Sequence, residues 1–177
     1  MNDKERKVTP IITLDMVLDE IDCANMRGEK ICIVYEGIEI HSDSLTKELY
    51  KELKAAEIRR LNKEIKELIP IWKKAGKEII PESKQEEWQS YIDNFFSGKV
   101  GFEEYNSYLY KDFDRAIAIL RSLKNGSITI QDAAFRLNYY LENDNKHIVN
   151  LILRFSENSE ELKEELNTLK TQKRSRF

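Results

Sequence analysis

Cysteine and histidine, the side chains that most often bind metals or serve as nucleophile and base, occur twice each, as Cys23, Cys32, His41 and His147. Zinc knuckles and fingers place their cysteines about two to four residues apart, whereas Cys23, Cys32 and His41 follow one another at intervals of nine residues. Cys23 falls in a predicted helix and Cys32 in a predicted strand, where buried and inert thiols are common. We therefore expect neither a metal site nor a bound cofactor.

Local signatures of catalysis and of phosphate binding are absent from the sequence. A nucleophile needs a histidine beside it and a carboxylate that orients this histidine, and neither His41 nor His147 lies in a motif such as GxSxG. The chain contains neither GxGxxG nor GxxxxGK[ST], the two glycine-rich loops that bind phosphates. A triad assembled in space from distant residues remains an open alternative.

Asp112 is the one carboxylate that projects from the edge of an apolar helical stripe. A partly buried carboxylate can be an acid with a perturbed pKa, and an enzyme built from scattered carboxylates and tyrosines would centre on it. More commonly such a group is satisfied by a tyrosine hydroxyl or by an arginine, for which Arg115 and Arg136 are the candidates. We expect the second arrangement.

Basic residues form one candidate binding surface, because they project from one side of a long predicted helix. They are Arg59, Lys63, Lys66, Lys73, Lys74 and Lys77. The acidic residues Glu57, Glu64 and Glu67 fall beside this stripe rather than within it. The stripe fits a nucleic-acid backbone or an acidic protein, and the alternative is an ordinary solvated face.

Aromatic residues form a second candidate binding surface, on a helix predicted to follow Thr129. Phe135 and Tyr139 lie one turn apart, with Arg136 beside them, opposite an apolar face that contains Leu137. A helix that is apolar on two sides is either sandwiched inside a bundle or presents its aromatic residues to a partner. Tyrosine, phenylalanine and arginine are typical of the residues that dominate protein interfaces.

The element that positions the basic stripe is the longest helical pattern in the chain, from Ser44 to Gly76. Ser44 is the expected N-cap and Gly76 the expected stop, and Pro70 predicts a kink or a break near Ile69. Its apolar residues form two stripes on different sides: Leu45, Leu49, Leu53 and Ala56, then Ile58, Leu61, Ile65, Leu68 and Trp72. We expect the first half to pack on the N-terminal segments of the chain and the second half on the C-terminal ones.

The N-terminal part of the chain predicts a helix followed by a β-hairpin. Thr13 is the expected cap of the helix and Gly28 its terminator. The stretch from Lys30 to His41 reads as a hairpin that turns at Glu36-Gly37. Residues 8–12 fit a short strand or an extended lead-in. The fold predicted here is an N-terminal helix plus β-hairpin packed on a long central helix.

The remainder predicts a C-terminal helical bundle. Caps, stops and 3.6-residue periodicity place helices at about 83–98, 102–124, 129–143, 146–155 and 159–170. The expected organisation is a helix and hairpin module at 1–56, a connecting helix at 44–76 shared by both modules, a bundle at 77–170 and a basic, flexible tail at 171–177.

Composition limits the function classes. The 177 residues carry a net charge of −3, which disfavours a general nucleic-acid binder but permits a local basic face. No apolar run approaches the length of a membrane span, and the charged N-terminus is followed by no signal-peptide core, so we expect a cytoplasmic protein that does not bind membranes. The richness in Lys, Glu, Ile and Asn is typical of a low-GC bacterium or of its mobile elements.

These observations favour a non-enzymatic protein-binding protein, an adaptor or inhibitor acting on a larger protein or ribonucleoprotein. The more specific form of this hypothesis is a phage or mobile-element inhibitor of a host nucleic-acid-processing complex such as a nuclease. One alternative is a nucleic-acid accessory protein that binds through the basic helix face, and another is an enzyme with a scattered carboxylate and tyrosine site. A homo-oligomer through the seam from Ile58 to Trp72 is a further possibility.

Overall fold

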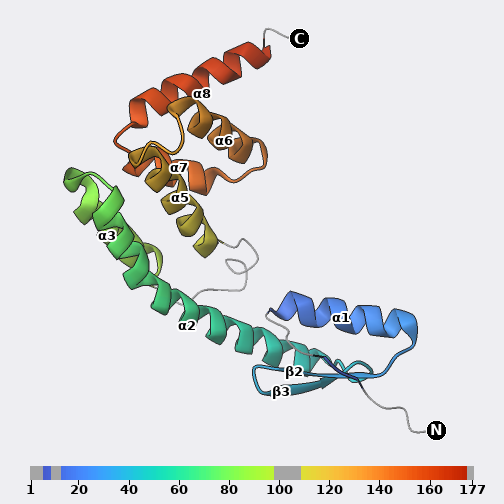
Figure 1. Ribbon diagram of the computed structural model, residues 1–177. Coiled ribbons are helices and arrows are strands. Elements are labelled where there is room, and N and C mark those ends of the chain that lie inside the picture. The colour runs from blue at the N-terminus through green and yellow to red at the C-terminus, as the bar shows by residue number, and fades with distance from the viewer. Residues whose placement is uncertain (1–5, 9–12, 98–108, 175–177) are drawn as a thin grey trace. The chain divides into compact units, whose positions relative to one another are not determined.

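The structure of the protein is a computed structural model that describes residues 6–8, 13–97 and 109–174 (Figure 1). These residues form a mainly α-helical fold, as the sequence predicts. In chain order the elements are β1 (Arg6–Val8), α1 (Leu14–Arg27), β2 (Ile31–Tyr35), β3 (Ile38–His41), α2 (Lys47–Ile79), α3 (Glu82–Phe95), α5 (Leu109–Lys124), α6 (Ile130–Glu142), α7 (Lys146–Phe155) and α8 (Ser159–Arg174).

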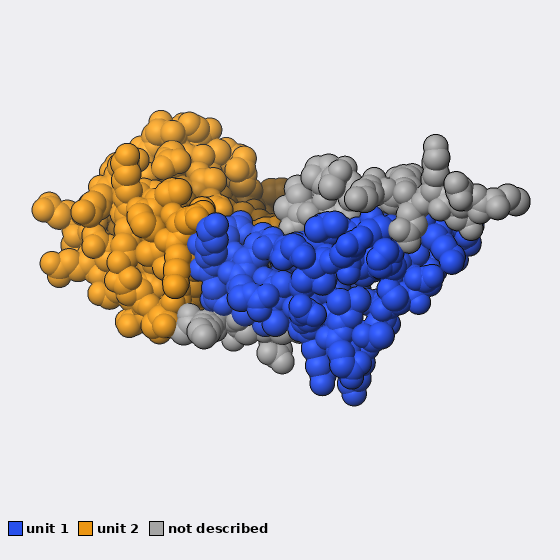
Figure 2. Space-filling view, turned by 90° about the horizontal axis from the view of Figure 1, so that it is seen from below, with its two compact units in different colours: residues 1–64, 100–102 blue, residues 65–99, 103–177 orange. Residues whose placement is uncertain are grey.

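The described residues divide into two compact units (Figure 2). Unit 1 ends at Glu64 and unit 2 begins at Ile65. The boundary falls within α2, so this helix contributes its first part to unit 1 and its second part to unit 2.

Unit 1 contains the predicted helix and hairpin. The Thr13 hydroxyl accepts a hydrogen bond from the Met16 amide at 3.3 Å and caps α1, which ends at Gly28 in the left-handed conformation with φ of 67°. The hairpin turns at Glu36 and Gly37, whose φ angles of 49° and 80° are both positive, as a two-residue type I′ turn requires. The sequence predictions for α1 and for the hairpin are therefore confirmed.

A third strand, β1, extends this hairpin into a sheet with the order β1-β2-β3. It pairs with β2 in parallel, with Val8 opposite Ile33. The strand includes Val8, as one of the two sequence interpretations expected, but it begins at Arg6. Residues 9–12, the rest of the predicted segment, lie outside the described residues.

The core of unit 1 forms where α1, the hairpin and the first part of α2 bury their apolar faces together. Its buried members are Leu14, Val17, Ile21, Ala24, Ile31, Ile33, Tyr35, Ile40 and Leu53. The helical residues recur every three or four positions and those of β2 every second position, so each element turns one face inward. Fully burying an aliphatic side chain of this size contributes about 1.5–3 kcal/mol.

The long helix α2 differs from its prediction at both ends, and of the predicted kink or break near Ile69 the break is wrong. It begins at Lys47 rather than after Ser44, because the Thr46 hydroxyl accepts a hydrogen bond from the Leu49 amide at 3.1 Å and supplies the N-cap. It is not broken at Pro70, and it continues through Gly76 to Ile79. Both Gly76 and Ile79 are buried, so packing within unit 2 favours the helical conformation beyond the expected stop.

The two apolar stripes of α2 are buried unevenly. Leu53, Ala56, Leu61, Ile65 and Trp72 are buried, whereas Leu49, Ile58 and Leu68 are partly exposed and Leu45 is exposed. Leu53 belongs to the core of unit 1, and Trp72 to the core of unit 2.

Unit 2 contains the helices of the predicted bundle, with changes at their ends. Helix α3 begins at Glu82 with Pro81 as its N-cap, and not after the predicted Ser83 cap. Helix α6 begins with the predicted capping box, in which Thr129 and Asp132 each bond the other's backbone amide. Helix α8 extends to Arg174, four residues beyond its predicted end. The predicted stop at Gly98 and the predicted start at Phe102 lie outside the described residues.

Stacked aromatic rings fill the centre of unit 2. Trp72 stacks on Phe113 with ring centroids 4.9 Å apart, and Trp88 meets the ring of Phe155 edge-on at 4.8 Å. All four side chains are fully buried. Around them α6 packs on α7 and α8, while α5 packs on α7. Within the described ranges, no helix combines the length and the apolarity that crossing a membrane requires.

Candidate functional site

The aromatic residues of α6 lie at the surface, as one of the two sequence interpretations requires. Phe135 is 66% exposed and Tyr139 is 60% exposed, and Arg136 between them is also exposed. The opposite side of the same helix carries Ala133, Ala134 and Leu137, which are fully buried. The interpretation that α6 is sandwiched on both sides is therefore wrong. We call Phe135, Arg136 and Tyr139 the α6 aromatic face.

The α6 aromatic face belongs to a rigid element. The capping box at Thr129 fixes the first turn of α6, and the side-chain amide of Gln131 donates to Glu165 of α8 at 3.1 Å. At the other end the Asn143 side chain donates to the Tyr139 carbonyl at 2.8 Å. The backbone that carries this face is therefore ordered before a partner binds, which removes one entropic cost of association.

The six residues of the predicted basic stripe do not behave alike. Arg59 and Lys63 are exposed in unit 1, and Lys66, Lys74 and Lys77 are exposed in unit 2. Lys73 is only partly exposed, and its ammonium lies 2.6 Å from the Asp93 carboxylate. The unit boundary falls between Lys63 and Lys66, so each unit presents a short basic segment of α2.

Asp112 lies in a hydrogen-bonded chain of side chains from three helices of unit 2. Its carboxylate is 2% exposed, and one oxygen lies 3.3 Å from Nδ1 of His147 while the other lies 3.3 Å from the Arg115 guanidinium. Nε2 of His147 lies 3.3 Å from the Tyr91 hydroxyl. The predicted partnership with Arg115 is confirmed, whereas the tyrosine contacts the histidine and not Asp112.

The chemistry of Tyr91, His147 and Asp112 decides which atom donates in each of their hydrogen bonds. An ionised carboxylate only accepts hydrogen bonds, so Nδ1 of a neutral His147 donates to Asp112 and Nε2 accepts the Tyr91 proton. Burial raises the pKa of Tyr91, although the nearby Arg154 guanidinium opposes this shift. Tyr91 therefore keeps its proton at neutral pH. In this arrangement Nε2 of His147 carries no proton, so it can take the Tyr91 proton but has none to return to the Tyr91 oxygen.

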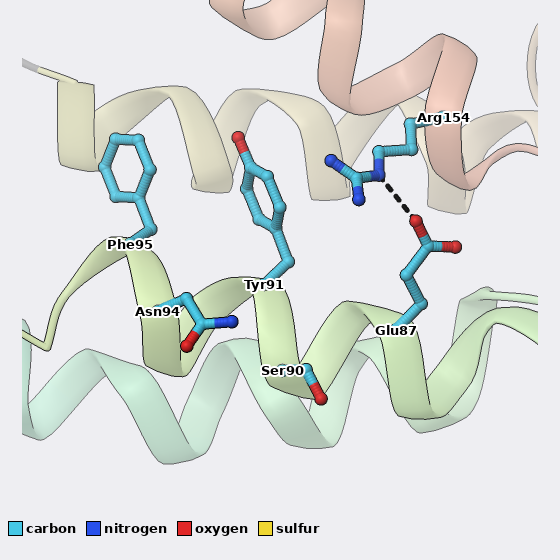
Figure 3. A pocket seen from close by; sticks show the side chains of 6 residues that line it. All are labelled: Glu87, Ser90, Tyr91, Asn94, Phe95 and Arg154. Atoms are coloured by element: carbon cyan, nitrogen blue, oxygen red, sulfur yellow. Dashed lines mark hydrogen bonds and ion pairs between the residues drawn. The ribbon is translucent and has the colours of Figure 1, made fainter.

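An open pocket of about 360 Å³ lies beside these hydrogen-bonded side chains, and Tyr91 is part of its lining. Figure 3 shows Glu87, Tyr91 and Phe95 projecting from the same side of α3, while the guanidinium of Arg154 reaches them from α7. Arg154 donates to Glu87 at 2.6 Å and lies 4.9 Å from the centre of the Tyr91 ring. Ser90 and Asn94 complete the lining. The pocket offers aromatic surface, one paired guanidinium and two small polar groups.

Sequence reasoning missed the buried polar network of unit 1. Glu57 was predicted beside the basic stripe, but it is fully buried, and its two carboxylate oxygens accept hydrogen bonds from Arg60 at 2.7 and 3.0 Å. The Tyr35 hydroxyl of β2 also donates to Glu57. Arg60 further bonds Glu64 at 3.1 Å. The available signal was the helical spacing of Glu57, which lies four residues after Leu53 and four before Leu61, both of them buried. The network joins the sheet to α2.

The comparisons with known proteins assign no family: no protein-family model matches the chain, and no curated protein or solved structure matches it.

Proposed function

We propose that this chain is a non-enzymatic protein-binding protein, an adaptor or inhibitor that docks on a larger protein through the α6 aromatic face. The observation that supports the proposal is the exposure of Phe135 and Tyr139 one turn apart on a helix whose other side is fully buried. These rings contribute little to the core of unit 2, and leaving large aromatic side chains in water costs free energy.

Composition and rigidity make this face suited to a protein partner. Phe135 and Tyr139 supply large contact areas with few rotatable bonds, and Arg136 between them supplies a planar group that donates hydrogen bonds. Asp132, Arg136 and Glu142 give the exposed side of α6 mixed charge. A nucleic acid would instead favour an excess of basic residues around the aromatic rings.

The experiment is affinity capture of the full chain from cells of its native host, followed by quantitative mass spectrometry. The test variant carries Phe135→Ala and Tyr139→Ala, and the control is Ile71→Ala, which removes an apolar side chain that is 59% exposed on α2 of the same unit. We expect proteins captured by the wild type and the control to be lost from the double variant. A captured set that does not change in the double variant contradicts the proposal.

The same capture separates a protein partner from a nucleic acid. Binding to phosphates falls steeply with salt, so a nucleic-acid accessory protein would lose its partner on nuclease treatment, at moderate salt, or on charge reversal of Lys63 and Lys66. We expect capture to survive all three. That the partner is a nucleic-acid-processing complex such as a nuclease rests on composition and remains a prediction. The absence of any nuclease or polymerase from the captured proteins would end it.

The chain from Tyr91 through His147 to Asp112 favours a second candidate, an acid-base site at the pocket. In such a site Nε2 of His147 would take the Tyr91 proton as the Tyr91 oxygen attacks the substrate, Asp112 would stabilise the imidazolium that forms, and the imidazolium would pass the proton to the leaving group. Any hydrolytic activity found with small ester and amide substrates should then fall on Tyr91→Phe and on Asp112→Asn without loss of fold. Activity that persists in both variants ends this candidate.

A further inference from the structure

The hairpin of unit 1 brings together three side chains of different ligand chemistry. Cys32 of β2 lies directly opposite His41 of β3 in the antiparallel register, and Glu39 precedes His41 by two residues and so shares its side of the strand. The Cys32 sulfur lies 3.1 Å from a Glu39 carboxylate oxygen, and the same oxygen lies 3.8 Å from Nε2 of His41. The three potential ligand atoms all lie within 4.8 Å of one another.

We propose that Cys32, Glu39 and His41 form a three-ligand zinc site. Zinc binds sulfur at about 2.3 Å and nitrogen or oxygen at about 2.0–2.1 Å, so the ligand atoms of a tetrahedral site lie roughly 3.3–3.6 Å apart. Two of the separations in the hairpin, 3.1 and 3.8 Å, are close to this range, and side-chain rotations would complete the approach of all three atoms to one ion. Thiolate, imidazole and carboxylate together suit zinc, whereas magnesium and calcium require oxygen ligands.

An ion can reach the three side chains from solvent, because only one of them is buried. Cys32 is 2% exposed, while the side chains of Glu39 and His41 are 61% and 40% exposed. The sulfur is therefore the inner ligand, and the other two can move to meet the ion from solvent. Water supplies the fourth ligand, because three protein ligands leave one tetrahedral position open. Binding releases the thiol proton, since the thiolate is the species that coordinates.

An ion at this site would link the two strands of the hairpin. Cys32 and His41 face each other at the end of the hairpin away from the turn at Glu36 and Gly37. An isolated two-stranded hairpin is only marginally stable. An ion that ties β2 to β3 at this end would hold the strands in register and stabilise unit 1 by mass action. This inference is independent of the proposed protein-binding function.

The test is a titration of the reduced, tag-free full chain with Co²⁺, a spectroscopic substitute for zinc. We expect one Co²⁺ per chain, an absorption band from thiolate-to-cobalt charge transfer, and loss of that band when Zn²⁺ is added. Cys32→Ser should abolish the band, and His41→Gln and Glu39→Gln should each weaken binding by at least about tenfold, since even outer-sphere changes cost this much. Cys23→Ser is the matched control, because it removes the other cysteine, which is exposed.

Three outcomes would overturn the proposal. They are the absence of a charge-transfer band from the wild type, its persistence in Cys32→Ser, and its loss in Cys23→Ser. A folding defect in Cys32→Ser would not spoil the test, because Glu39 and His41 are both exposed enough for substitution without disturbing the core. The urea midpoint of each variant, measured without metal, separates lost binding from lost structure.

Discussion

The indole of Trp88 occupies the space that a side chain at Gly76 would need. A methyl group at Gly76 would overlap Cδ1 and Nε1 of this indole, and the indole N–H donates to the Trp72 carbonyl of the same helix at 2.9 Å. The glycine is therefore a packing residue inside α2, and it permits α3 to approach the helix backbone. The fully buried Trp88 has no space into which it can retreat.

Gly76→Ala should lower the free energy of unfolding by about 1–3 kcal/mol, the usual cost of overpacking a core. The sign of this change is informative, because replacing glycine by alanine in a helix interior normally raises the free energy of unfolding by about 1 kcal/mol. Urea denaturation of the two chains measures the difference.

The control for Gly76→Ala is the same change in a Trp88→Leu background. Without the indole, we expect Gly76→Ala to be neutral or stabilising by up to about 1 kcal/mol. An equal loss of stability in both backgrounds would show that the glycine is needed for a reason other than Trp88.

The buried carboxylate of Glu57 depends on Arg60 for its charge compensation. Arg60→Leu should cost about 3–5 kcal/mol of unfolding free energy, because it leaves a buried charge without its bidentate partner. The double variant Glu57→Leu with Arg60→Leu should be more stable than Arg60→Leu alone, since it removes both charges. If the double variant is instead the less stable of the two, Glu57 stabilises the protein even without Arg60, through its hydrogen bond with Tyr35.

Local signals made unit 1 predictable. Thr13 caps the start of α1, Gly28 ends it with a positive φ, and Glu36-Gly37 forms the hairpin turn. Each of these signals lies where one predicted element ends and the next begins. The same type of signal misled at α2. Gly76 and Pro70 are helix breakers in isolation, but the burial of Trp72, Gly76 and Ile79 in unit 2 overrides them.

The candidate sites were predictable only where one element carries the whole pattern. The α6 aromatic face lies on one helix, so its helical periodicity reveals it. By contrast, the partner of Asp112 on α7 is 35 residues away along the chain, and Cys32 meets Glu39 and His41 only through the register of the hairpin. Sequence spacing cannot show such pairs until the strands and helices have been placed against one another.

Tyr35 should make the protein sensitive to alkaline pH. Burial raises the pKa of Tyr35, as do its hydrogen bond and its proximity to the Glu57 carboxylate, while Arg60 opposes the shift. The unfolded chain loses this proton near pH 10, whereas the folded chain retains it to higher pH. The stabilisation is therefore complete below pH 10 and is lost as the pH rises towards the folded-state pKa.

Urea midpoints for the wild type and Tyr35→Phe, measured on both sides of pH 10, check this linkage. The variant should lose less stability with rising pH than the wild type, and below pH 10 the difference between the two chains should not vary. Parallel curves across the whole range would mean that Tyr35 ionises equally in the folded and unfolded chains.

Pro70 lies at an exposed position inside α2, where it cannot donate a hydrogen bond to the Lys66 carbonyl. Pro70→Ala restores that N–H, and proline in a helix interior costs about 3 kcal/mol relative to alanine. Removing the proline also raises the conformational entropy of the unfolded chain, which lowers the gain in unfolding free energy by about 0.4–1 kcal/mol. We therefore expect a net rise of about 2 kcal/mol in unfolding free energy, with slow exchange of the new amide proton. Ile71→Ala, at the next position, which is also exposed, is the control that changes a side chain but no backbone donor. A Pro70→Ala protein that is no more stable than the wild type would mean that the core of unit 2 has adapted to the backbone which proline imposes, so that Trp72 and Ile79 pack best on a helix without that hydrogen bond.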